Sequence, residues 1–131
     1  MPRRARPDFS FSWSEGRFVD LWMLVHTSSG VAGGLFSVFL PWRYWQVALA
    51  GFGLMVLWEV LEYAWGIRES AANVLLDVVV GMVGLSFGLW AASLVSTSTG
   101  RWLWVAMLAV TLTGTGLGAR AAKRRASKAA T

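Results

Sequence analysis

The chain has 131 residues, of which 56% are hydrophobic, 15% are charged and nine are tryptophan. A soluble domain of this length has too little interior for so much apolar mass, so the composition argues against a soluble fold and favours a membrane protein. Cysteine is absent, which excludes disulfides and thiolate chemistry.

Residues 1–18 are polar and basic but carry Phe9, Phe11 and Trp13 at alternating positions. This pattern is typical of a segment that lies on a membrane surface with its rings among the headgroups. The apolar run that follows contains Asp20 and His26 and lacks a small-residue cleavage site, so we interpret it as a membrane span and not as a signal peptide.

Four apolar segments follow one another at about 19–40, 44–66, 71–95 and 102–118. Each is close to the roughly 17–25 residues that cross a bilayer as an α-helix. The sequence therefore predicts an all-α transmembrane bundle of four helices in residues 19–118, with short links. Pro41 ends the first segment, aromatic residues at 42, 44 and 45 predict an interfacial belt, and residues 96–101 are predicted to form a turn.

Basic residues divide unequally between the two sides that four spans define. Only Arg43 and Arg101 lie on one side, and the others lie on the opposite side: Arg3, Arg4, Arg6, Arg17, Arg68, Arg120, Lys123, Arg124, Arg125 and Lys128. The positive-inside rule places both termini in the cytoplasm of a multi-pass protein of the cytoplasmic (bacterial inner) membrane. Residues 119–131 form a basic cytoplasmic tail, either a frayed helical extension or unstructured. We expect the net charge of +5 to attract anionic lipid headgroups and not nucleic acid.

Ionisable residues inside the apolar segments are the main functional signal, because they are costly in a bilayer unless they face protein, water or a ligand. At 1.5 Å per residue, His26 and Glu59 lie roughly 10 Å from the cytoplasmic surface and Asp77 about 9 Å. The three side chains, from three spans, are therefore predicted to form one polar layer.

The helical faces agree with this prediction. Positions 73, 77, 81, 84 and 88 share one face of the third span, Met55, Glu59 and Glu62 share a face of the second, and Trp22, His26 and Gly30 share a face of the first. We expect a polar vestibule on the cytoplasmic side of the layer, formed by Asp20, Glu62, Arg68, Glu69, Ser70 and Asn73.

Several chemistries fit this layer. The groups can neutralise one another, with Arg68 pairing a carboxylate and His26 hydrogen-bonding another, or they can relay protons. They can bind a lipid headgroup or small polar ligand. His26, Glu59 and Asp77 also form a nitrogen and oxygen ligand set for a divalent metal, although the second span has Glu-x-x-Glu and not the Glu-x-x-His of di-iron bundles. An axial role for His26 on a haem or chlorophyll-type ring is disfavoured by Trp22 one turn earlier.

Glycine pairs Gly30/Gly34 and Gly84/Gly88 have GxxxG spacing, which predicts close helix packing. The Gly and Trp faces are candidate contacts for membrane protein partners. A serine nucleophile beside His26 is not recognisable, so the sequence leans against an enzyme.

The stretch from Glu59 and Glu62 through Arg68-Glu69-Ser70 to Asn73, Asp77, Gly81 and Gly84 resembles the core of VanZ-like and YjdF-like membrane proteins, and Asp20 with His26 resembles their early Asp-to-His segment. In this chain Asn73 precedes Asp77, the reverse of the usual order. The resemblance implies a small polytopic envelope protein of a group in part associated with glycopeptide resistance. It also implies a functional group of Glu59, Arg68, Asp77 and His26.

The sequence therefore predicts a VanZ-like membrane protein whose polar intramembrane site binds a lipid headgroup or small polar ligand, with candidates His26, Glu59, Glu62, Arg68, Asn73 and Asp77. One alternative is a non-catalytic accessory subunit of a larger membrane complex, for example an energy-transducing or photosynthetic one. The other is a metal-dependent membrane enzyme.

Overall fold

The computed structural model describes residues 10, 13, 20–65 and 69–129. It contains four α-helices and one short 3-10 helix: α1 (Trp22–Leu35), η1 (Phe36–Phe39), α2 (Tyr44–Ala64), α3 (Ala71–Leu94) and α4 (Thr97–Ala129). No strand occurs within the described ranges. The prediction of an all-α chain with four helices is confirmed.

Three of the helices, α2, α3 and α4, are long and apolar enough to cross a membrane, and the chain is a multi-pass membrane protein. The bounds of α2 and α3 lie within two residues of the predicted segments. The first helix is shorter than predicted, because α1 has 14 residues and its end tightens into η1. At helical rises of about 1.5 and 2.0 Å per residue, α1 and η1 together are about 29 Å long, close to the thickness of a hydrocarbon core.

The prediction of a turn at residues 96–101 is wrong, because α4 already begins at Thr97. Ser96 starts the helix: its hydroxyl accepts a hydrogen bond from the Thr99 N–H at 3.2 Å, and its carbonyl accepts one from the Gly100 N–H at 2.9 Å. A serine before the first turn is a preferred N-cap. At the other end, α4 continues through the basic tail to Ala129, where alanine, lysine and arginine are all strong helix formers.

Helix α1 packs mainly against α3, and the contact is made by glycines on both sides. A Cβ atom at Gly30 would collide with the Gly81 carbonyl oxygen, and one at Gly84 would collide with that of Thr27. A Cβ atom at Gly34 or at Gly88 would likewise collide with the backbone of the facing helix. The two GxxxG pairs therefore bring α1 and α3 of the same chain together, and only glycine permits this approach.

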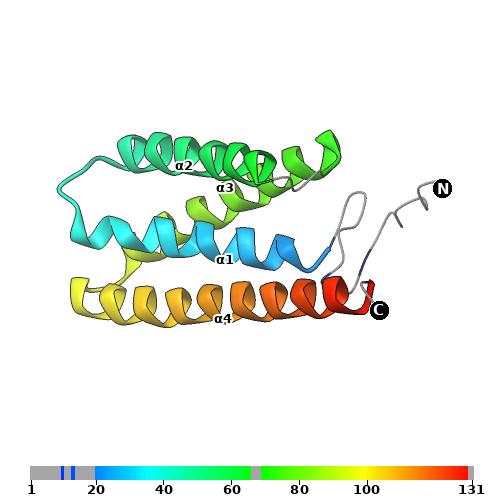
Figure 1. Cartoon of the computed structure of the whole chain (residues 1–131). Coiled ribbons are helices and arrows are strands. Elements are labelled where there is room, and N and C mark those ends of the chain that lie inside the picture. The colour runs from blue at the N-terminus through cyan, green and yellow to red at the C-terminus, as the bar shows by residue number, and fades with distance from the viewer. Residues whose placement is uncertain (1–9, 11–12, 14–19, 66–68, 130–131) are drawn as a thin grey trace.

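Helix α4 covers a different part of α1, and α2 packs mainly on α3 (Figure 1). Although a short link joins α1 and η1 to α2, the main packing partner of α1 is α3 and not α2. The Thr111 hydroxyl of α4 donates a hydrogen bond to the Ser28 hydroxyl of α1 at 3.0 Å. In Figure 1, α1 begins and α4 ends at the same end of the bundle, where α2 also ends and α3 begins.

Large apolar side chains on α2 and α4 point outward, as a lipid-facing surface requires. Leu54 of α2 is 67% exposed and Trp102 of α4 is 73% exposed. The aromatic residues of the predicted belt, Trp42, Tyr44 and Trp45, are also exposed. At the opposite end of α2, the rings of Trp58 and Trp65 meet edge to face with centroids 6.0 Å apart.

Candidate functional site

Two polar side chains of α3 lie completely inside the bundle. Asn73 is 0% exposed and Asp77 is 1% exposed. Ser70 precedes the helix, and its hydroxyl accepts a hydrogen bond from the Asn73 N–H at 3.1 Å, so a serine N-cap sets where α3 begins. This start places Asn73, Asp77, Gly81, Gly84 and Gly88 on the buried face, as their spacing predicts.

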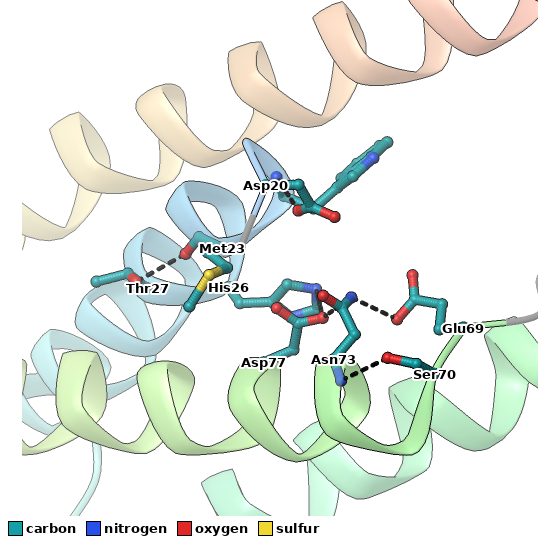
Figure 2. Close-up of polar contacts among 9 residues, drawn as sticks. Asp20, Met23, His26, Thr27, Glu69, Ser70, Asn73 and Asp77 are labelled. Atoms are coloured by element: carbon teal, nitrogen blue, oxygen red, sulfur yellow. Dashed lines mark hydrogen bonds and ion pairs between the residues drawn. The ribbon is translucent and has the colours of Figure 1, made fainter. Parts of the chain in front are cut away.

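The Asn73 amide joins two carboxylates, that of Glu69 before α3 and that of Asp77 one turn further along it, as Figure 2 shows. Its Nδ2 donates to Asp77 Oδ2 at 2.9 Å and to Glu69 Oε2 at 3.0 Å. Both hydrogens of the amide nitrogen are therefore used. The hydrogen bond to Oδ2 orients the Asp77 carboxylate and leaves Oδ1 without a donor among the described residues.

His26 of α1 faces the same carboxylate. Its Nε2 atom lies 3.9 Å from Asp77 Oδ2, and its side chain is 14% exposed (Figure 2). The close α1–α3 contact at Gly30 and Gly81 is one turn further along both helices, so the glycine packing brings this histidine up to α3.

Glu59 of α2 completes the group. One ligand atom from each of His26, Glu59 and Asp77 lies within 4.8 Å of the others. Three helices thus bring the predicted layer together. A second group shares Glu59, because carboxylate oxygens of Glu59, Glu62 and Glu69 also lie within 4.8 Å of one another.

Two buried oxygens in this layer lack a hydrogen-bond partner among the described residues: Asn73 Oδ1 and Asp77 Oδ1. A buried acceptor without a donor costs about 1–3 kcal/mol, and more if it is charged. Buried polar atoms are otherwise almost always paired, so two adjacent exceptions mark a place where a further atom belongs.

The predicted vestibule differs in part from the structure. Asn73 belongs to the layer itself, and Asp20 is only 4% exposed. The Asp20 carboxylate instead accepts the Trp22 N–H at 2.9 Å and so stabilises the start of α1. Glu62 and Glu69 are half-buried, as an entrance requires. Arg68 lies outside the described residues.

A cavity of about 430 Å³ lies beside the layer, lined by residues of all four α-helices. Its polar lining residues are His26, Ser29, Glu62 and Thr115. The others are apolar or glycine: Trp22, Val25, Gly33, Gly51, Leu54, Met55, Trp58, Leu85 and Leu112. Glu59 and Asp77 are not among the lining residues, whereas His26 both lines the cavity and belongs to the layer.

Sequence reasoning missed the part that α4 plays, because this helix has no acidic residue or histidine. Leu112 and Thr115 close one side of the cavity, and Thr111 bonds to Ser28. The spacing of Thr111 and Thr115, one helical turn apart in an apolar segment, is the signal that could have indicated this face.

Comparisons of the chain with models of protein families, with curated proteins and with solved structures find no significant match.

Proposed function

We propose that this multi-pass membrane protein binds a membrane amphiphile, with the headgroup beside His26 and Glu62 and the apolar chain toward Gly33 and Gly51. The observation that carries the proposal is the cavity of about 430 Å³: its ionisable lining residues, His26 and Glu62, lie toward the start of α1 and the end of α2, and Gly33 and Gly51 line it further along both helices. Its volume lies within the range of about 300–1,000 Å³ that is common for small-molecule sites.

The polarity of the cavity follows the direction of α1. His26 is near the start of the helix and Gly33 is seven residues later, about 10 Å along the axis. Glu62 and Trp58 of α2 line the first end, and Gly51 of α2 lines the second. A ligand that is polar throughout would leave the second end unfilled, whereas an amphiphile matches both ends.

The cavity opens toward the lipid. Leu54 and Leu112, which line it from α2 and α4, are 67% and 63% exposed, so its rim lies on the apolar surface of the protein. In Figure 1, α1 lies between α2 and α4, and all three helices contribute lining residues to the cavity, His26 of α1 among them. A ligand can therefore enter from the bilayer without crossing water.

The carboxylate at the polar end selects the headgroup. Glu62 accepts hydrogen bonds when ionised, and a buried or half-buried carboxylate gains most from an ammonium or hydroxyl donor. The resemblance to VanZ-like and YjdF-like proteins supports the same proposal of a small envelope protein of the cytoplasmic membrane, with both termini in the cytoplasm.

Mass spectrometry of the full-length protein, extracted in a mild detergent, tests the proposal. We expect about one amphiphile per chain to remain bound and to be released on unfolding. The variant Glu62→Gln should retain several-fold less of it, because the amide keeps the size of the side chain but removes the charge from the headgroup contact.

A control for Glu62→Gln is Gln46→Glu, which makes the reverse change at the other end of α2, where the Gln46 side chain accepts the Arg43 N–H. It should retain the wild-type amount. If folded wild-type protein carries no amphiphile above the level found in an unrelated membrane protein from the same membranes, the proposal is wrong.

A further inference from the structure

We propose that His26, Glu59 and Asp77 bind one divalent transition-metal ion, with Asn73 Oδ1 as a further oxygen donor. The site goes beyond the proposed function: the two sites share His26, but Glu59 and Asp77 do not line the cavity and the proposed headgroup contact does not use them.

The geometry requires only a small contraction. One donor atom from each of the three residues already lies within 4.8 Å of the others. Two ligands at about 2.1 Å from a tetrahedral ion are roughly 3.4 Å apart, so each side chain has to move by about 1 Å or less. His26 Nε2 and Asp77 Oδ2 are 3.9 Å apart and need to move least.

The unpaired oxygens point to a ligand independently of the cluster. Asp77 Oδ1 and Asn73 Oδ1 are both buried and have no donor among the described residues, while the Asn73 nitrogen is occupied by Asp77 and Glu69. The two oxygens belong to the Asn73 amide and the Asp77 carboxylate, which are joined by a hydrogen bond of 2.9 Å. A cation bound by the Asp77 carboxylate supplies the electron-pair acceptor that these oxygens lack among the described residues.

Electrostatics favour a cation at this place. Glu59 belongs both to the group with Asp77 and to the group with Glu62 and Glu69, so several carboxylates surround one point. Burying like charges together is unfavourable unless a counter-charge accompanies them. A divalent ion supplies that charge within the layer.

The donor types select the class of metal. One imidazole nitrogen with two carboxylates and an amide oxygen suits Zn²⁺, Mn²⁺ or Fe²⁺. Mg²⁺ and Ca²⁺ prefer sites made only of oxygen, so His26 argues against them.

The test uses the full-length protein in mild detergent, freed of metal by a chelator and then equilibrated with Mn²⁺ or Zn²⁺. We expect about one ion per chain by elemental analysis. With Mn²⁺, pulsed electron paramagnetic resonance should detect coupling to an imidazole nitrogen, and His26→Gln should remove that coupling.

Glu59→Gln and Asp77→Asn should each weaken the affinity for Mn²⁺ by roughly 100-fold or more, because loss of even an outer partner of a metal ligand costs 10–100-fold. Gln46→Glu is the control: it changes a charge at the other end of α2, away from the ligand set, and we expect a change in affinity of less than about threefold.

Two results would overturn the metal site. One is folded wild-type protein that binds less than about one ion per five chains at saturating Mn²⁺ and Zn²⁺, which would mean that protons neutralise the layer. The other is unchanged affinity in the variants. Should Asp77→Asn fail to fold, Glu59→Gln decides the matter, because Glu59 is only half-buried.

Discussion

The amide nitrogen of Asn73 donates a hydrogen bond to the carboxylate of Asp77 one turn further along α3, at 2.9 Å, and both side chains are almost completely buried. The same nitrogen also bonds to Glu69, which lies before the helix. Asn73 therefore links Glu69 at the entrance to the buried carboxylate of Asp77.

Replacing Asn73 with alanine should lower the free energy of unfolding by about 1–3 kcal/mol, because the Asp77 and Glu69 carboxylates lose their donor. Thermal unfolding in detergent measures the change. Ser86→Ala is the control: the Ser86 hydroxyl is exposed and bonds only to the Met82 carbonyl of its own helix, so its loss should change stability by less than about 0.5 kcal/mol. Equal stability of Asn73→Ala and wild type would contradict the role of Asn73.

Glycine packing between α1 and α3 gives a second prediction. Gly84→Ala places a Cβ atom against the Thr27 carbonyl, so the two helices must separate. We expect a loss of about 2 kcal/mol or more, as for other overpacked interiors. At Gly116 of α4 a Cβ atom meets nothing within 4 Å, so Gly116→Ala should be neutral or stabilising by up to about 1 kcal/mol.

The free energy of unfolding of both glycine variants and of wild type, measured in the same detergent, shows whether a loss of stability comes from the α1–α3 contact or from alanine at any helical glycine. If Gly84→Ala were as stable as Gly116→Ala, the α1–α3 contact described here would be wrong.

The N-cap of α3 gives a third prediction. Ser70→Ala removes the acceptor for the Asn73 N–H and should cost about 1 kcal/mol of stability. Ser70→Thr keeps a hydroxyl at the cap and should restore most of that loss. A threonine variant as unstable as the alanine variant would show that the hydroxyl is not what matters.

Membrane topology is a fourth prediction. A reporter fused after Thr131 should be active on the cytoplasmic side, and one inserted in the link at residues 41–43 should read as external, because the basic residues favour that orientation. External activity of the C-terminal fusion would reverse the orientation and place the polar layer near the outer surface.

Much of the fold could be predicted from the sequence. Helices α2 and α3 are uninterrupted apolar runs between turn residues, and the spacing of Asn73, Asp77 and the glycines defined one buried face correctly. The convergence of His26, Glu59 and Asp77 followed from depth, since helical rise is constant.

Other features depend on which helices meet, and hydropathy does not contain that information. The pairing of Gly30 with Gly81 and of Gly84 with Thr27 requires knowing that α1 lies on α3. The sequence left the basic tail open between a helical extension and an unstructured segment, because it has helix propensity but no hydrophobic signal, and the structure continues α4 to Ala129. The cavity is lined by residues of all four α-helices, so no local pattern in one segment indicates it.

The most direct measurement of the central claim compares two equal substitutions at two glycines. Gly33 lines the apolar end of the cavity, and a Cβ atom there would lie at an ordinary 3.8 Å from Leu85 Cδ1, so methionine can extend into the cavity without a clash at its base. Gly53 is exposed on α2, and a Cβ atom there meets nothing within 4 Å. Mass spectrometry of protein purified from the same membranes should find the amphiphile in wild type and in Gly53→Met and several-fold less of it in Gly33→Met. Equal amounts in the two folded variants would contradict binding in this cavity.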